Sequence, residues 1–388
     1  MARIRVVFSI GGLHGGGSER QLVSLLRNLD RTRFEPFLYL VYRTGPLLDL
    51  VPKDVPVVAF EERVRPSRFY LPGRMHRLRV SDYAAYLKEV GAHVSYDRTF
   101  LMTLISADGA QRVGVPNVST IVTNPETGFA PVAGRFQWLK RRILHRLYNH
   151  SSRVLAVSDG ARQAAIRFYG IAPEKIVVHA NGVDVDLVNQ LAAVPVSDPW
   201  WSSEQPFRIV TAGRLNEQKG FHFLIEAIQL LRARLPNKSI RLAILGDGPW
   251  KEELQSRIRA AGLESSIHLA GFQSNAAAWY RSADLFVLPS LVEGSPNVLL
   301  EAIVCGTPVI SSDCPSGPAE ILRGGQLGRL VPPGNSEALA EAIGESIARY
   351  PMWLATAKAA EQMVITENSI RSSARKLEAI FEEVALQA

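Results

Sequence analysis

Short apolar runs rich in β-branched residues alternate along the chain with longer segments in which apolar residues recur every three or four positions. The short runs predict buried strands, and the longer segments predict helices. We expect strands at 3–10, 36–42, 55–60, 93–97, 117–122, 153–158 and 176–180 in the first half, and at 207–213, 240–246, 267–271, 285–290, 308–313 and 328–332 in the second. This alternation is typical of βαβ units, so the sequence predicts an α/β fold with two doubly wound parallel sheets.

A segment with three prolines, residues 194–206, separates the two halves and breaks both periodicities, as expected of a linker. We therefore predict an N-terminal domain over 1–192 and a C-terminal domain over 205–366. The final segment, 367–388, has one apolar helical face and is expected to return to the first domain. Open α/β sheets bind ligands at the carboxyl ends of their strands, so we expect the ligand in a cleft between the domains.

The composition is that of an ordinary globular protein, because 47% of the 388 residues are hydrophobic and 21% are charged. No apolar run approaches the roughly 20 residues that a membrane span needs, and the start lacks the layout of a signal peptide. We therefore expect a cytoplasmic protein. The only two cysteines, Cys305 and Cys314, exclude a disulfide framework and are expected to be buried free thiols.

The positive charge is concentrated in the first half. Residues 1–190 contain 26 Lys and Arg against 16 Asp and Glu, whereas the remainder contains 18 against 21. A one-sided basic field suggests an anionic partner, which could be nucleic acid, a membrane surface or a phosphorylated substrate.

Glycine-rich turns follow several predicted strands. The first strand runs into Gly11–Gln21, where glycines allow an anion to approach backbone N–H groups at the start of a helix. The loop has neither the Gly-Lys-Ser/Thr ending of an NTPase nor a clean dinucleotide fingerprint, and it could equally be a tight turn. A second such turn, at Gly246, follows the strand at 240–246 and permits close approach of a flat or anionic ligand.

Two basic residues, Arg214 and Lys219, follow the strand at 207–213 and precede a helix. Together they could neutralise a diphosphate without a metal, or they could be ordinary solvated charges. Two acids, Glu293 and Glu301, flank a helix start at which Ser295 is the expected cap and Pro296 the expected first position. The acids are expected roughly 7–10 Å apart, a separation that suits the hydroxyl groups of a hexose and a ribose, or they could be two ordinary acids at a helix start. The backbone amides of Asn297, Val298 and Leu299 between them are expected to be free for phosphate oxygens.

Six motifs occur in the order seen in one enzyme family. They are Gly16-Gly17-Ser-Glu-Arg20, Asn181-Gly-Val-Asp184, Gly213-Arg-Leu with Lys219-Gly220, Gly246-Asp-Gly-Pro249, the Glu293 to Glu301 pair and Gly306-Thr-Pro-Val-Ile310. On these motifs the chain resembles the retaining nucleotide-sugar glycosyltransferases of family four, which have the GT-B fold of two Rossmann-like domains. The resemblance covers nearly the whole chain and is strongest over residues 207–333.

The resemblance implies a role for each matching position. Gly16 and Gly17 would approach the donor phosphates, Arg214 and Lys219 would hold the diphosphate, Glu293 would face the donor sugar and Glu301 would take the ribose. The base would lie near Gly246 and Phe272. No cofactor and no metal are implied, because the nucleotide sugar is a co-substrate and Asp184-Val-Asp186 follows an Asn-Gly turn that makes it structural.

The chain departs from the family pattern on the acceptor side. Where many relatives have a histidine, it reads Val122-Thr-Asn-Pro125, so Asn124 or Thr123 would be the substitute. His14 in the glycine loop is a spare candidate for the general base that would accept the proton of the acceptor hydroxyl. Ala180 replaces the usual proline before Asn181, which affects the rigidity of the loop.

The reaction that the resemblance implies is transfer of a hexosyl unit from a UDP- or GDP-sugar, UDP being favoured, to a cell-envelope glycan or lipid-linked acceptor with retention of configuration. A GT-B enzyme of another type, such as a sugar-nucleotide 2-epimerase, is the alternative. A nucleic-acid binder is disfavoured, since the chain has no recognised nucleic-acid module.

Two basic stretches lack any acid: Arg63–Val80, which includes Phe69 and Tyr70, and Arg135–Arg153. In the second, Phe136, Leu139, Ile143 and Leu147 share a helical face with basic residues around it. This helix either lies on an anionic bilayer, which would place the protein peripherally at the inner face of the membrane, or covers its own sheet with its apolar stripe.

Overall fold

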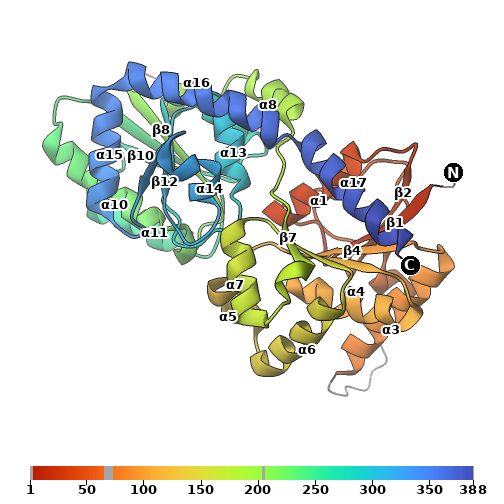
Figure 1. Cartoon of the computed structure of the whole chain (residues 1–388). Coiled ribbons are helices and arrows are strands. Elements are labelled where there is room, and N and C mark those ends of the chain that lie inside the picture. The colour runs from red at the N-terminus through yellow and green to blue at the C-terminus, as the bar shows by residue number, and fades with distance from the viewer. Residues whose placement is uncertain (1–2, 65–72, 203–205, 388) are drawn as a thin grey trace. The chain divides into compact units, whose positions relative to one another are not determined.

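The computed structural model describes residues 3–64, 73–202 and 206–387, and it divides into two compact units. The first unit comprises Met1–Gly182 and Ile370–Ala388, and the second comprises Val183–Ser369. Each unit is a parallel sheet with helices on both faces, as drawn in Figure 1. The predicted fold class of two doubly wound α/β units is confirmed, and all thirteen predicted strands occur.

The first unit contains a seven-stranded sheet in the order β3-β2-β1-β4-β5-β6-β7. The strands are β1 (Ile4–Ile10), β2 (Phe34–Leu40), β3 (Val57–Ala59), β4 (Val94–Arg98), β5 (Asn117–Ile121), β6 (Arg153–Ala156) and β7 (Ile176–Val178). The helices are α1 (Gly17–Asn28), α2 (Phe60–Arg63), α3 (Arg74–Glu89), α4 (Phe100–Val113), α5 (Pro125–Ala133), α6 (Gln137–His150), α7 (Asp159–Tyr169) and α17 (Ile370–Leu386), with short 3₁₀ turns at Leu48–Leu50 and Pro173–Lys175.

Side chains of β1 show why this sheet is buried on both faces. Val6 and Phe8 pack into the core formed with α1 and α17, whereas Val7 lies in the core beneath α3 and α4. Successive strand residues point to opposite faces, so a strand that is covered on both sides is apolar at nearly every position.

The second unit contains a six-stranded sheet in the order β10-β9-β8-β11-β12-β13. The strands are β8 (Phe207–Ala212), β9 (Ile240–Leu245), β10 (Ile267–Gly271), β11 (Leu285–Leu288), β12 (Val309–Ser312) and β13 (Arg329–Val331). The helices are α8 (Val185–Ala192), α9 (Pro199–Ser202), α10 (Phe221–Arg234), α11 (Lys251–Ala260), α12 (Ala276–Ser282), α13 (Asn297–Val304), α14 (Pro318–Ile321), α15 (Ser336–Ala348) and α16 (Tyr350–Glu367), with 3₁₀ turns at Glu217–Lys219 and Arg323–Gly325.

The boundary between the units differs from the predicted one. It lies at Gly182–Val183, because α8 packs on α12 and α13 of the second unit. The segment 194–206 is no free linker in its described part. Trp201 is buried in the second unit, where its indole N–H donates to Ser282 Oγ at 2.8 Å. Burial of Trp201 and partial burial of the adjacent Trp200 outweigh the prolines that suggested a linker.

The last helix, α17, returns to the first unit, where Figure 1 shows it beside α1. Phe381 makes edge-on contacts with Phe8, Phe34 and Tyr96. Ion pairs of Arg33 with Glu378 and Glu382 add to this packing.

The apolar stripe predicted for the basic helix α6 is divided in the structure. Leu147 is buried against the unit's own core together with Leu144 and Tyr148, whereas Phe136 and Leu139 at the start of the helix are exposed. The prediction of a single shared face was therefore wrong, because Phe136 is the left-handed N-cap before α6 and Leu139 lies about 80° from Leu147 around the helix. In the other basic stretch, Arg65, Arg68, Phe69 and Tyr70 lie outside the described residues.

Candidate active site

The order of the second sheet reverses between β8 and β11, and this is where the predicted donor residues gather. Loops that follow two strands on either side of such a reversal leave a crevice at the carboxyl edge of the sheet. Arg214 and Lys219 follow β8, and Glu293 follows β11. These three residues therefore belong to neighbouring loops, although some 80 positions separate them in the sequence.

Backbone contacts hold the loop after β8 in place. The Leu215 N–H donates to Asp247 O at 3.0 Å, and the Asn216 side chain accepts from the Lys219 N–H at 3.2 Å. Gly220 then takes a left-handed conformation with φ of 64°, and a Cβ there would lie 2.1 Å from Pro289 O. Only glycine fits this position, and the resulting tight approach brings Lys219 against the loop that follows β11.

Lys219 and Glu293 form an ion pair at the centre of the site. The Lys219 Nζ lies 2.6 Å from Glu293 Oε1, and the Ser290 hydroxyl donates to the same oxygen at 2.7 Å. Glu293 is only 8% exposed, and the Ser316 hydroxyl fixes its backbone by donating to Glu293 O at 2.6 Å. A buried carboxylate needs such partners, because a buried charge left without them is strongly unfavourable.

Cys314 lies in the same surroundings as this pair. Burial raises the pKa of its thiol to about 12, and the negative charge of Glu293 acts in the same direction. The group therefore stays a neutral thiol at ordinary pH and is not a nucleophile. Both cysteines are buried and free, as predicted.

The turn after β9 packs directly on the turn after β8. Gly246 has φ of 138°, and a Cβ there would lie 1.9 Å from Gly213 O. On the next strand, Phe272 follows the end of β10 and exposes most of its ring. Gly246 and Phe272 thus lie at the carboxyl ends of adjacent strands, while Arg214 is exposed at the end of β8.

The helix expected between the two acids begins one residue later than predicted. Helix α13 starts at Asn297, and Pro296 is its N-cap, with an extended ψ of 106°. The Leu299 N–H already donates to Pro296 O at 3.1 Å, so the prediction of three free amides was wrong for Leu299. Glu301 lies in the second turn of α13 and is half-buried.

In the first unit, the glycine loop after β1 is bonded to an acid of its own helix. The Glu19 carboxylate accepts from the N–H groups of Gly15 and Gly16, at 2.6 and 2.9 Å. Gly16 is the N-cap of α1, and Gly17 is its first residue. The signal for this arrangement was an acid three positions after the cap, which the sequence analysis did not use.

The two acceptor-side candidates have local hydrogen bonds. The His14 Nε2 is 3.2 Å from Thr44 Oγ1, and its ring is exposed. Asn124 is buried, and its side-chain oxygen accepts from the Glu126 N–H at 2.9 Å, which makes it the cap of α5. Asn124 therefore has a structural role at the carboxyl end of β5. A side-chain amide can accept a hydrogen bond, but it is too weakly basic to remove a proton from an acceptor hydroxyl.

A buried polar group that sequence reasoning missed lies where the first sheet reverses, between β1 and β4. Arg98, at the end of β4, is 1% exposed and donates to Tyr96 Oη and Asn181 Oδ1, at 3.2 and 3.0 Å. Among the described residues it forms no ion pair. His179 lies nearby, and burial lowers its pKa to about 4, with the positive charge of Arg98 adding to the shift.

Asp184 of the Asp-Val-Asp motif caps α8 by accepting from the Leu187 N–H at 3.1 Å. This hydrogen bond gives Asp184 a structural role. Across residues 3–64, 73–202 and 206–387, no group of three His, Cys, Asp or Glu side chains is placed to hold a metal ion. In the same residues no helix has the length and apolar character needed to span a membrane.

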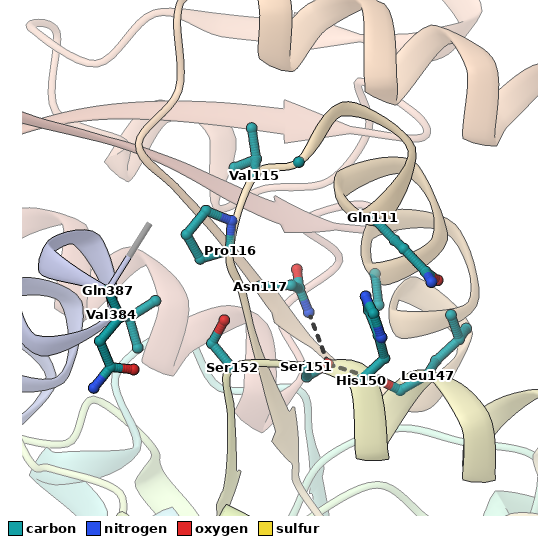
Figure 2. A pocket seen from close by; sticks show the side chains of 12 residues that line it. Gln111, Val115, Pro116, Asn117, Leu147, His150, Ser151, Ser152, Val384 and Gln387 are labelled. Carbon is teal, nitrogen blue, oxygen red and sulfur yellow. Dashed lines mark hydrogen bonds between the residues drawn. The ribbon is translucent and has the colours of Figure 1, made fainter.

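A cavity of about 230 Å³ lies at the amino edge of the first sheet, opposite the carboxyl ends of its strands, and is shown in Figure 2. It is lined by residues that precede β5 and β6, including Pro116 and Ser152, and by Val384 of α17. Its polar groups bond to one another, since Asn117 donates to Ser151 Oγ and Ser151 donates to Leu147 O. None of the predicted site residues lines it.

Two family models match the chain: glycosyltransferase family 4 over residues 15–187 and glycosyl transferases group 1 over residues 206–349. The chain is 34% identical over 208 residues to the putative colanic acid biosynthesis glycosyltransferase WcaL of Salmonella typhimurium, a match that covers 52% of this chain and 48% of WcaL. At 32–37% identity, the chain spans 36–48% of the length of the curated relatives it matches.

A longer match, at 25% identity over 349 residues and 87% of each chain, is with the N-acetylgalactosamine-N,N'-diacetylbacillosaminyl-diphospho-undecaprenol 4-alpha-N-acetylgalactosaminyltransferase of Campylobacter jejuni. The crystal structure of HepE from Anabaena in complex with UDP and glucose superposes with a TM-score of 0.81 at 22% identity, covering 98% of this chain and 100% of HepE. This likeness shows that the two units have the GT-B fold.

Proposed function

Because the chain belongs to glycosyltransferase family 4, we propose that it transfers a hexosyl residue from a nucleotide sugar, with UDP-sugars favoured, to a cell-envelope glycan or a lipid-linked acceptor. The observation that carries this proposal is the Lys219–Glu293 ion pair beside Arg214 at the reversal point of the second sheet. A cation and a carboxylate held together there provide one partner for a diphosphate and one for sugar hydroxyls.

Donor binding then exchanges the partners of this pair. The diphosphate takes Lys219 and Arg214, together with backbone amides at the start of α13, while the sugar hydroxyls donate to Glu293. Glu301 accepts from the ribose hydroxyls, and the base lies against Gly246 and Phe272. Each charged group keeps hydrogen-bond partners throughout, because Lys219 pairs with a phosphate while Glu293 accepts from sugar hydroxyls and from Ser290.

In this proposal the chain accelerates the chemical step by electrostatic stabilisation of the leaving group. The departing diphosphate gains negative charge, and Arg214, Lys219 and the amides of Asn297 and Val298 stabilise it without a metal or a cofactor. The leaving phosphate itself accepts the proton of the attacking hydroxyl, on the same face of the sugar, and the anomeric configuration is retained. This step requires no protein base, which agrees with the hydrogen-bonded roles of His14 and Asn124.

The names of the relatives support a cell-envelope acceptor. WcaL is described as a colanic acid biosynthesis enzyme, and the Campylobacter enzyme acts on a diphospho-undecaprenol-linked sugar. We place the protein on this basis in the cytoplasm, peripherally at the inner face of the membrane that carries such lipids.

The donor site is tested by thermal unfolding with a panel of UDP- and GDP-sugars. We expect one donor, at about 100 times its dissociation constant, to stabilise the protein by about 3 kcal/mol, equivalent to a rise in melting temperature of several degrees. The variant Arg214→Ala with Lys219→Ala should lose this rise.

The matched control is Lys238→Ala with Arg259→Ala, which removes two exposed cations from the same unit and should keep the rise. A rise that survives in the first variant would refute the assignment of the diphosphate site. Consumption of the donor without an acceptor would instead favour an enzyme of the epimerase type.

A further inference from the structure

Exposed apolar side chains gather at the junction of α5 and α6 in the first unit. Phe136 and Trp138 are 62% and 68% exposed, and Val132 and Leu139 nearby are also exposed. Large apolar side chains left in solvent within eight positions form a patch that needs a covering partner.

The backbone holds this patch in a fixed and costly conformation. Phe136 has φ of 61°, in the left-handed region that a bulky residue adopts only at a cost of about 1–3 kcal/mol. The Gln137 side-chain amide and the Lys140 ammonium donate to Ala130 O and Ala133 O, which ties the start of α6 to the end of α5. The Arg135 guanidinium lies over the Phe136 ring, 5.6 Å from its centroid. The turn thus keeps an aromatic ring in solvent that contributes nothing to the core.

Basic side chains continue from this patch along the outer face of α6. Leu144, Leu147 and Tyr148 define the inner face, and Trp138, Arg142 and Arg146 recur at intervals of four on the outer one. Both arginines are exposed, and neither has an ion-pair partner among the described residues. No Asp or Glu occurs between Glu126 and Asp159, so nothing acidic in that stretch offsets the charge.

The patch lies at the carboxyl edge of the first sheet. Helices α5 and α6 connect the end of β5 to the start of the parallel strand β6, so the first residues of the connection lie near the carboxyl edge and the last near the amino edge. Residue His150 at the end of α6 accordingly lines the cavity at the amino edge. The exposed residues at the start of α6 therefore lie toward the same edge as the glycine loop after β1 and the cap Asn124 after β5.

From these four observations we infer that residues 132–146 dock on an anionic lipid bilayer, with Phe136, Trp138 and Leu139 inserted below the headgroups and Arg142 and Arg146 at the lipid phosphates. Apolar rings beside unpaired arginines are complementary to a bilayer surface that is apolar inside and negative outside. The inference rests on the proposed function in one respect: the bilayer would present a lipid-linked acceptor at the edge of the sheet where the acceptor side is proposed.

Flotation of the full chain with vesicles tests the docking surface. We expect binding to vesicles of phosphatidylcholine and phosphatidylglycerol in roughly a 3:1 ratio, and much weaker binding to phosphatidylcholine alone. Phe136→Gly with Trp138→Ser should weaken binding about 100-fold, and the glycine removes the backbone strain, so the fold is preserved. Arg142→Gln with Arg146→Gln should weaken it about 30-fold, at roughly a factor of five for each arginine.

Two controls match these variants. Met352→Ser with Leu354→Ser removes two exposed apolar side chains from α16, and Lys238→Gln with Arg259→Gln removes two exposed charges from the second unit. Both should float like the unchanged chain. No flotation with either lipid, or equal losses in variants and controls, would overturn the inference, and the latter would assign the binding to nonspecific charge or to another surface.

The donor-induced rise in melting temperature, measured on the same variants, separates the two proposals. If vesicle binding is lost and the donor effect is kept, the docking surface is assigned and the proposed function stands. If vesicles bind but no nucleotide sugar stabilises the chain, docking stands and the proposed function fails.

Discussion

The two sheets carry charged side chains at their reversal points, but they stabilise them in different ways. In the first unit the Glu19 carboxylate is held by backbone N–H groups, and the Arg98 guanidinium is held by a tyrosine hydroxyl and an asparagine carbonyl. In the second unit Lys219 and Glu293 hold each other. The partners are neutral dipoles in the first case and an opposite charge in the second.

Under the proposed function, this difference distinguishes the carboxyl edge of the second sheet, which exchanges ligands, from that of the first. A charge bonded to backbone amides or to a buried amide keeps its partners as long as the fold persists. A charge bonded to a side chain of opposite sign can exchange that partner, as in the proposed function, where Lys219 turns to a diphosphate and Glu293 to sugar hydroxyls. Glycine-rich turns at strand ends thus hold charges in two ways here, and under the proposed function the second leaves Lys219 available to a diphosphate.

The largest effect is expected from adding a side chain at Gly246, where two turns at the carboxyl edge of the second sheet are in close contact. Gly246→Ala places a methyl group against Gly213 O and should lower the free energy of unfolding by about 4 kcal/mol, measured by urea denaturation. Gly262→Ala is the control, since Gly262 also has a positive φ but has no atom within 4 Å of its Cβ position, and it should cost about 1 kcal/mol. Equal losses of unfolding free energy in the two variants would show that Gly246 is required only for its backbone conformation and not for its close contact with Gly213.

At the carboxyl edge of the first sheet, we expect the free energy of unfolding to fall in acid, because a buried histidine there is held neutral. His179 is buried beside Arg98, and its Nε2–H donates to Ser373 O at 2.9 Å. Its pKa is lowered from 6.5 to about 4, so between these values the unfolded chain binds a proton that the folded chain does not. Stability should therefore fall by up to about 3 kcal/mol as pH decreases from 6.5 to 4.

His179→Gln keeps the donor to Ser373 O and should remove this pH-dependent part, measured by urea denaturation at a series of pH values. His150→Gln, at an exposed position, should leave it unchanged. If the His179→Gln profile coincides with that of the unchanged chain, the acid sensitivity does not come from this edge.

Breaking the Lys219–Glu293 ion pair should cost more when only the cation is removed than when both charges are removed. Lys219→Met leaves Glu293 buried without its cation and should cost about 2 kcal/mol, less than a fully buried pair because Lys219 is partly exposed. Adding Glu293→Gln should restore part of this loss, as a double-mutant cycle measures. The transfer rate of either variant should fall by a factor of about 100–1000, and additive stability losses would show that the two groups do not act as a pair.

The smallest effect is expected at the glycine loop of the first unit. Glu19→Gln keeps the hydrogen bonds to Gly15 and Gly16 with a weaker acceptor and should cost about 1 kcal/mol in unfolding free energy. Glu174→Gln, on an exposed turn of the same unit, is the control. A gain in donor affinity in Glu19→Gln would show that the carboxylate competes with a phosphate, which would make the two edges more alike than the structure indicates.

Much of this architecture could be predicted from periodicity because buried parallel strands are apolar on both faces, and all thirteen strands were located in that way. Trp201 shows the limit: its position among prolines suggests a linker, and only the packing of its indole against Trp279 and Ser282 places it in the second unit. Local composition does not encode such long-range burial.

The candidate site was accessible to sequence reasoning only as separate motifs. Lys219 and Glu293 could each be selected as chemically suitable, but their pairing follows from the adjacency of β8 and β11, which is set by the order of strands. Ser290 and Ser316, which hold Glu293, gave no signal beyond being small polar residues near strand ends. Asn124 illustrates the opposite case, since a capping asparagine before a proline is a local pattern that the search for an acceptor residue passed over.

The return of α17 to the first unit affects the order in which the protein can mature on the ribosome. The 187 residues of Val183–Ser369 are synthesised between the two parts of that unit, which at about 5–20 residues per second takes roughly 10–40 s. During that time Phe8, Phe34 and Tyr96 lack the contacts that they later make with Phe381. The core of the first unit is therefore incomplete until α17 has been synthesised.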